Sequence, residues 1–122
     1  MDVTLRLGEI VIDCADHETV VAFWLEAMGD YARIDVNEQY VAIAPAKPSV
    51  GRPAILFQSV PEPKVVKNRV HLDLRGESMV AEVERLQGLG ATFIAERTLG
   101  ESLRWTVMAD PEGNEFCVSG ER

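Results

Sequence analysis

The sequence repeats itself at an interval of about sixty residues, and this repetition limits the possible fold more than any other feature. The matching landmarks are Glu9 and His71, Gly29 and Gly90, and Phe57-Gln58 and Phe116-Cys117, which lie 62, 61 and 59 positions apart. Loops of unequal length account for a drift of this size. Self-similarity at a fixed interval indicates an internal duplication of one structural unit.

Each copy has the pattern of a strand, an amphipathic helix and three further strands. In the first copy, Val20, Phe23, Trp24, Ala27 and Met28 follow the spacing of an apolar helix stripe. Asp16 is suited to cap this helix, and Gly29 to end it. In the second copy, the helix stripe contains Val80, Val83, Leu86 and Leu89 and is followed by turn signals at Gly88 and Gly90.

The expected strands cover residues 5–14, 31–36, 39–44, 54–60, 69–75, 91–96, 103–109 and 114–119. The sequence therefore predicts an α+β fold of two βαβββ modules, residues 1–60 and 69–119, within a single domain of residues 1–122. We expect the two sheets to form one curved mixed sheet with the helices on its convex side.

The charge of the chain excludes some classes of partner. Its 122 residues carry 20 acidic and 12 basic side chains, a formal net charge of −8, which repels nucleic-acid phosphates. No apolar run is long enough to span a bilayer, and no signal peptide is evident. The two cysteines, Cys14 and Cys117, form no CxxC motif. We therefore expect a cytoplasmic protein that binds neither nucleic acid nor membranes.

Three segments carry a resemblance to a known group of proteins. These are DCADHETVVAFWLEAMG, VHLDL with the helix and LGA that follow it, and ADPEGNEFCV. Together with the duplicated βαβββ pattern, they resemble the vicinal oxygen chelate superfamily, which includes glyoxalases, bleomycin-resistance proteins and extradiol dioxygenases. The likeness spans nearly the whole chain and is greatest to the small glyoxalase-like domain proteins.

This resemblance implies a metal site. Members that bind metal carry one ligand on the first strand and one on the last strand of each module, and these places fall on Glu9, Gln58, His71 and Cys117. His, Glu and a thiolate suit zinc or another soft divalent ion, whereas Gln is more typical of hard cations. Cys117 stands where metal-binding members usually have Glu. The cofactor is accordingly either one divalent metal, zinc or similar, or none.

Each of these residues also has a structural interpretation. His71 on a half-buried strand can be a hydrogen-bonded core residue, and Glu9 an exposed strand carboxylate. Cys117 can be a small core hydrophobe. Asp73 shares the strand face of His71 and is either a ligand-binding residue or a rim charge, and Trp105 either stacks on a ligand or packs. Cys14 falls on the opposite strand face from Glu9 and is expected in the core.

Three functions fit these observations. The first is lyase or isomerase chemistry of the glyoxalase type, with Glu9 and His71 as catalytic residues and a metal that polarises two substrate oxygens. The second is metal-free binding of a small molecule, as in the bleomycin-resistance proteins. The third is an interaction domain with a filled, inert cavity. The resemblance also implies a homodimer.

Overall fold

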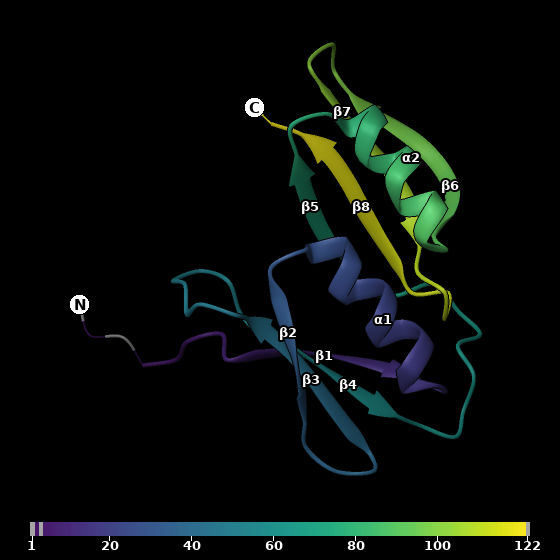
Figure 1. Cartoon of the computed structure of the whole chain (residues 1–122). Helices are drawn as coiled ribbons and strands as arrows, with labels where there is room; N and C mark the ends of the chain where they lie inside the picture. The colour runs from purple at the N-terminus through teal and green to yellow at the C-terminus, as the bar shows by residue number, and fades with distance from the viewer. Residues whose placement is uncertain (1, 3, 122) are drawn as a thin grey trace. The chain divides into compact units, whose positions relative to one another are not determined.

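The computed structural model describes residue 2 and residues 4–121, and the chain divides into two compact units, Met1–Pro63 and Lys64–Arg122. The first contains β1 (Glu9–Cys14), α1 (His17–Met28), β2 (Tyr31–Asp35), β3 (Tyr40–Pro45) and β4 (Ala54–Ser59). The second contains β5 (Leu72–Gly76), α2 (Met79–Leu89), β6 (Thr92–Leu99), β7 (Leu103–Ala109) and β8 (Glu115–Gly120) (Figure 1). The predicted α+β fold of two βαβββ modules is confirmed.

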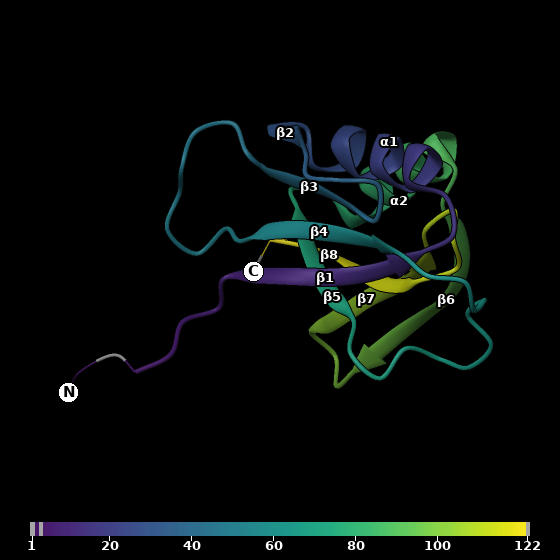
Figure 2. The same ribbon diagram turned by 90° about the horizontal axis from the view of Figure 1, so that it is seen from below.

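The two units have the same sheet topology. Their strand orders are β1-β4-β3-β2 and β5-β8-β7-β6, so the first strand of each unit lies beside the fourth. That pair is parallel in both units, and the remaining neighbours are antiparallel. Within each unit the helix packs against one side of its own sheet (Figures 1 and 2). An identical order in both units is what an internal duplication predicts.

The core of the first unit lies between α1 and its sheet. Trp24 and Phe23 are 1% and 3% exposed, and their rings meet edge to face at 5.2 Å. Along β1 the side chains alternate, and Cys14 is buried whereas Glu9 is exposed. The expectation that Cys14 belongs to the core is therefore confirmed, and the face of β1 that carries Glu9 points away from that core.

The second unit has an equivalent core under α2. Leu86 is the buried residue of that helix, and Met108, Phe116 and Val118 from β7 and β8 are at most 2% exposed. His71 and Asp73 belong to the opposite alternation of their strand segment and are exposed. In both units, therefore, the candidate residues at the first strand, Glu9 in one and His71 and Asp73 in the other, are on the sheet face opposite the helix-covered core.

The helix ends follow the predicted capping pattern with one correction. The Asp16 carboxylate accepts a hydrogen bond from the Glu18 amide at 3.0 Å, as an N-cap does. Gly29 and Gly90 end the helices with φ of 83° and 117°, values that favour glycine. Gly88 lies inside α2 rather than ending it. Neither helix in the described part of the chain is long and apolar enough to cross a membrane.

Two strands, β1 and β5, begin at least three positions later than the sequence predicted. β1 starts at Glu9 rather than at residue 5, because its parallel partner β4 begins only at Ala54, directly after Pro53. Proline has no amide hydrogen and is disfavoured within a sheet ladder. β5 starts at Leu72 rather than at residue 69, so His71 directly precedes the strand instead of lying within it.

Candidate functional site in the second module

His71, Asp73 and Cys117 come together at one point of the second module. Their possible ligand atoms all lie within 4.8 Å of one another, and His71 Nε2 is 3.2 Å from Asp73 Oδ1. The sheet register explains this proximity, because Asp73 on β5 pairs directly with Cys117 on β8. Paired residues of neighbouring strands point to the same side of a sheet, and His71 lies two positions before Asp73.

The three side chains differ in their access to solvent. The side chains of His71 and Asp73 are 40% and 71% exposed, whereas Cys117 is 4% exposed. Burial, the nearby Asp73 charge and a hydrogen bond from the thiol to Asp73 raise the pKa of Cys117 to about 11. At neutral pH the thiol is therefore protonated and donates to Asp73, so Asp73 links the other two members of the cluster.

The first module has no comparable cluster at the equivalent positions. The two helix caps, Asp16 and Ser78, lie 62 residues apart, which aligns Glu9 with His71 and Val11 with Asp73. Leu56 pairs with Val11 in the same way as Cys117 pairs with Asp73. The polar trio of the second module thus corresponds to Glu9, Val11 and Leu56, of which only Glu9 can bind a metal.

This register corrects the equivalence that the sequence suggested for Gln58. β4 and β8 start 61 residues apart, at Ala54 and Glu115, so the counterpart of Gln58 is Ser119 rather than Cys117. Matching the two phenylalanines by residue type shifted the alignment by two positions, which leaves the strand face unchanged. Gln58 lies beside Asp13 on that face, and its role as a metal ligand stays a prediction.

The remaining predicted site residues lie on strands of their own units. Glu9 is exposed at the start of β1 and pairs with Ala54. Its expected convergence with His71 stays a prediction. Trp105 lies on β7, is half-buried, and pairs with Arg97 of β6. It shares the sheet face of Val107, which pairs with Cys117, so Trp105 and the trio lie on the same side of the second sheet.

A polar clamp holds the segment that leads to His71. Glu115 accepts hydrogen bonds from Lys64 Nζ at 3.1 Å and from the Asn68 amide at 3.2 Å, and its own amide donates to Asn68 Oδ1 at 3.0 Å. Asn68 Nδ2 also donates to Asn114 Oδ1 at 3.3 Å. The clamp therefore fixes residues three positions before His71 and two before Cys117. The sequence prediction missed it, because no spacing marks contacts between residues so far apart.

The clamp makes a pH-dependent contribution to stability. Burial would raise the pKa of the Glu115 carboxyl, but the hydrogen bonds from Lys64 and the backbone outweigh it and hold that pKa below its usual value. A depressed carboxyl pKa stabilises the fold above the unfolded-state pKa, and this contribution is lost as pH falls through the folded-state pKa.

We expect Glu115→Gln to lower the free energy of unfolding by about 1–2 kcal/mol at pH 7, because it removes charge-assisted hydrogen bonds. The difference from the unsubstituted protein should shrink as pH falls below the ordinary glutamate pKa of about 4.3 and then through the lower pKa of Glu115 in the folded protein. Urea unfolding at several pH values measures both effects. Glu77→Gln, at an exposed position of the same module, is the control. A difference that does not shrink as the pH is lowered would contradict this account.

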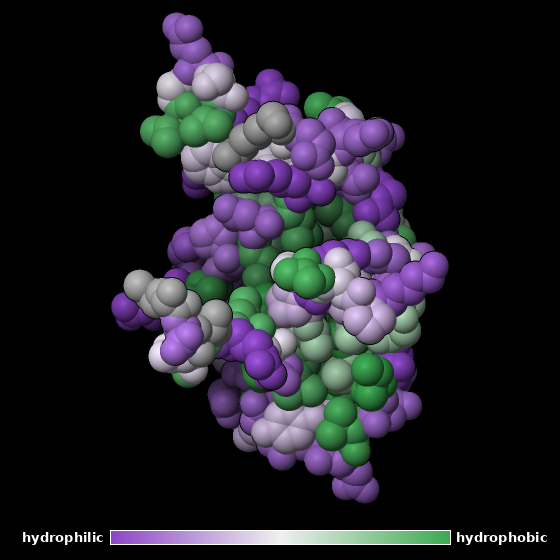
Figure 3. All heavy atoms as spheres, turned by 90° about the vertical axis from the view of Figure 1, so that its left-hand side faces the viewer, coloured by the Kyte–Doolittle hydropathy of each residue, from purple (hydrophilic) through white to green (hydrophobic). Residues whose placement is uncertain are grey.

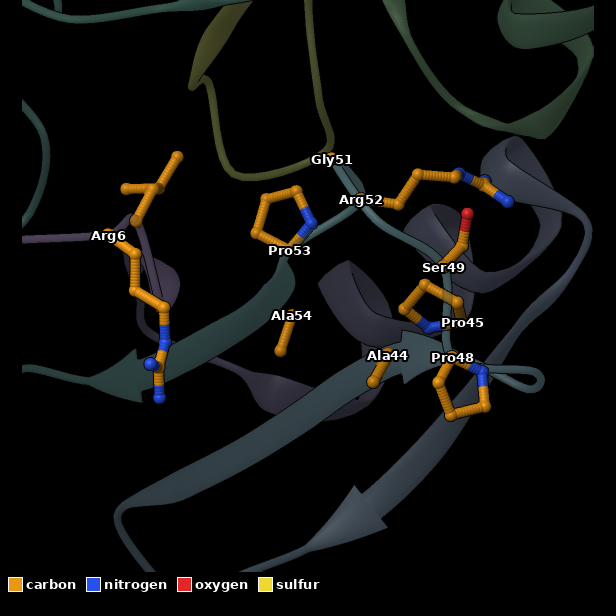
Figure 4. A pocket seen from close by; sticks show the side chains of 11 residues that line it. Arg6, Ala44, Pro45, Pro48, Ser49, Gly51, Arg52, Pro53 and Ala54 are labelled. Atoms are coloured by element: carbon orange, nitrogen blue, oxygen red, sulfur yellow. The ribbon is translucent and has the colours of Figure 1, made fainter. Parts of the chain in front are cut away.

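The first module contains a separate pocket of about 530 Å³ between residues 6–8 and the loop before β4 (Figure 4). Its wall includes Pro45, Pro48 and Pro53, and Arg6 and Arg52 lie on opposite sides of Pro53 (Figure 4). The Arg52 guanidinium is paired with Asp30 and lies 5.2 Å from the Tyr31 ring. The Arg52 charge is therefore neutralised by Asp30, and the pocket offers mainly an apolar surface.

Comparison with known proteins identifies the family. The model of the glyoxalase-like domain matches residues 9–119, which is most of the chain. The chain belongs to the glyoxalase-like domain family. It is therefore a member of the vicinal oxygen chelate superfamily, as its resemblance implied. No curated protein matches the sequence.

Several solved structures share the fold of this glyoxalase-like chain. A glyoxalase/bleomycin resistance protein/dioxygenase family enzyme from Burkholderia phytofirmans PsJN has a TM-score of 0.72 at 18% identity, over 93% of this chain and 96% of that one. The antibiotic-binding protein TnmS3 from Streptomyces sp. CB03234 has a TM-score of 0.69 at 17% identity, over 99% and 100%. Lactoylglutathione lyase from Agrobacterium tumefaciens has a TM-score of 0.67 at 16% identity, over 94% and 92%. At these identities the likeness concerns the fold.

Proposed function

We propose that this glyoxalase-like protein acts on a small molecule at a soft divalent metal, zinc in preference, held by His71, Asp73 and Cys117 of the second module. The observation that carries the proposal is the proximity of one imidazole, one carboxylate and one thiol within 4.8 Å. Zinc accepts all three ligand types at about 2.0–2.3 Å, and catalytic zinc sites commonly have three protein ligands and one open position. Ligand atoms around a tetrahedral zinc lie roughly 3.5 Å apart, so a modest closure would complete the site.

The residues of this site have separate roles in the proposal. The metal, when bound, would polarise an oxygen of the substrate as a Lewis acid. Cys117 must lose its proton to bind the metal, because only the thiolate is a strong ligand. Asp73 accepts the hydrogen bond of the Cys117 thiol and lies 3.2 Å from His71 Nε2 without metal, and so keeps the two side chains close to each other. Glu9, the other predicted catalytic residue, would act as the base that moves a proton adjacent to a substrate carbonyl.

A second candidate function is metal-free binding of a small molecule. In the first module, Val11 and Leu56 take the positions of Asp73 and Cys117. Because neither can bind a metal, the equivalent face of the first module supports a function without metal. The protonated Cys117 thiol also fits a site without metal. In this case the same face of the second sheet would bind the ligand through hydrogen bonds and apolar contact. The antibiotic-binding protein TnmS3, which shares the fold, is compatible with this alternative.

Elemental analysis of protein purified without added metal separates the two functions. Close to one zinc per chain supports the first proposal. Protein that is free of metal after purification, and that takes up none from micromolar zinc, would overturn it and leave ligand binding without metal. Cysteine oxidation during purification is controlled by counting the free thiols of Cys14 and Cys117 in the same sample.

We also propose that the protein is a homodimer. β6 is the last strand of its sheet and carries three exposed large apolar residues, Phe93, Ile94 and Leu99. Apolar side chains reach the surface in groups between hydrophilic ones, as Figure 3 shows for one side of the molecule. Strand edges and apolar patches of this kind tend to be covered by a partner, and a two-fold dimer is the simplest cover.

Light scattering at micromolar concentration should give the mass of a dimer. Because each chain carries a net charge of −8, added salt should tighten the association. Ile94→Lys should shift the mass toward the monomer, whereas Val80→Lys on the exposed side of α2 should not. A monomer mass at both low and high salt would overturn the proposal of a dimer.

A further inference from the structure

Two arginines of the second module lie on the same sheet face as the His71–Asp73–Cys117 cluster. Arg75 stands two positions after Asp73 and pairs with Ser119, and Arg97 pairs with Trp105. Since Trp105 shares the face of Val107, and Val107 pairs with Cys117, all of these side chains point to one side of the sheet. The register thus forms a row of Arg75, Ser119, Trp105 and Arg97 across four strands, next to the cluster.

The charges in this row are not neutralised within the part of the chain that the structure describes. Arg75 and Arg97 are exposed, and neither makes an ion pair or a side-chain hydrogen bond there. By contrast, Arg104, next to Trp105 in sequence, points to the other side of the sheet and pairs with Glu96 at 3.1 Å. Two unpaired cations beside a half-buried indole stand out in a chain with a net charge of −8.

The chemistry of this row indicates the kind of molecule that it suits. A half-buried indole offers a flat apolar surface on which a planar ring can stack. Guanidinium groups bind carboxylates through paired N–H donors. Neighbouring strands lie about 4.8 Å apart, so Arg97 is one strand and Arg75 two strands from Trp105, within the reach of one small ligand.

We infer that the ligand of this protein is a planar aromatic carboxylate, which stacks on Trp105 and places its acidic group between Arg75 and Arg97. This inference deepens the proposed function, since it rests on a small molecule binding on the cluster's face of the second sheet. It assigns Arg75 and Arg97 as specificity-determining residues. Neither depends on a bound metal for its contact with the ligand.

NMR titration of the full chain with 2-naphthoate tests the inference. The protein has two tryptophans, Trp24 in the core of the first module and Trp105, so its spectrum contains two indole N–H signals. The Trp105 signal should shift in a saturable manner and the Trp24 signal should stay in place, with Trp24→Phe providing the assignment. The neutral 2-naphthamide should bind at least about tenfold more weakly, because it lacks the charge that the arginines recognise.

Variants complete the experiment. Arg75→Gln and Arg97→Gln should each weaken 2-naphthoate binding about tenfold and leave binding of 2-naphthamide unchanged. Arg104→Gln, an arginine adjacent to Trp105 on the other side of the sheet, should change neither. Equal binding of the acid and the amide, an unmoved Trp105 signal, or no effect of the arginine variants would each overturn the inference.

The titration is carried out with and without zinc, so the two proposals can fail separately. Binding of 2-naphthoate in the presence of a chelator, with no uptake of zinc, would support the anion site and overturn the metal site. Uptake of one zinc without binding of 2-naphthoate would overturn the anion site and support the metal site.

Discussion

Replacing Cys117 with alanine is expected to weaken zinc binding by at least about a hundredfold. Loss of residues that only support metal ligands typically costs 10–100-fold, so the loss of a thiolate ligand should cost more. His71→Ala should have a similar effect. A competition titration with a chromogenic zinc chelator measures both. Asp73→Asn, which retains the shape of the side chain but not its charge, should weaken binding by an intermediate amount.

Cys14→Ala is the matched control for this experiment. Cys14 is a free cysteine as deeply buried as Cys117, but it lies in the core of the first module, on the opposite sheet face from Glu9 and Gln58. Its replacement should leave zinc affinity unchanged. If Cys14→Ala and Cys117→Ala lowered the affinity equally, the loss would reflect damage to the fold, and the assignment of Cys117 as a ligand would be wrong.

Trp24→Ala is expected to lower the free energy of unfolding by about 3–5 kcal/mol. The indole is 1% exposed and packs edge to face against Phe23, so its removal leaves a large cavity in the core of the first module. Urea unfolding followed by circular dichroism measures the change. Trp24→Phe retains a ring at this position and should lose less, which provides a measurable variant if the alanine variant does not fold.

Val80→Ala provides the comparison for Trp24→Ala on the other helix. Val80 is 63% exposed on α2, so its truncation should change stability by less than about 0.5 kcal/mol. A loss below 1 kcal/mol for Trp24→Ala would contradict the packing described for the first module. It would also mean that the apolar stripe of α1 does not identify the buried face of that helix.

The fold was predictable from the sequence because its signals are local. The stripe that includes Phe23 and Trp24 reports which helix face is buried, and Asp16 and Gly29 report where the helix begins and ends. These properties depend on neighbours within a few positions along the chain. Repetition of the same signals near a sixty-residue interval then establishes two equal modules, which the shared strand order confirms.

The candidate site was predictable only in part, because it depends on how distant strands pair. The sequence placed His71 and Cys117 in one candidate ligand set, and in the structure both lie within 4.8 Å of each other and of Asp73. It also matched Gln58 to Cys117, although the registers of the two sheets give Leu56 that place. A shift of two residues preserves the strand face, so alternation of side chains could not reveal the error.

The role of Asp73 shows the same limit of local information. The sequence placed it on the face of His71, as either a ligand-binding residue or a rim charge, and did not name it as a metal ligand, because a carboxylate beside a histidine has no distinctive spacing. Only the pairing of Asp73 with Cys117 brings it within reach of the thiol. The unpaired arginines, Arg75 and Arg97, likewise become noticeable once the register aligns them with Trp105.

Titration with cobalt(II) tests the metal site of the second module most directly. Cobalt accepts the same ligands as zinc and, when bound to a thiolate, acquires a sulfur-to-metal charge-transfer absorption in the near ultraviolet. One equivalent of cobalt per chain should produce this band in the unsubstituted protein and in Cys14→Ala, and the band should be absent in Cys117→Ala. Saturation without a charge-transfer band, or an equal band in Cys117→Ala, would show that Cys117 does not bind the metal and would contradict the proposed site.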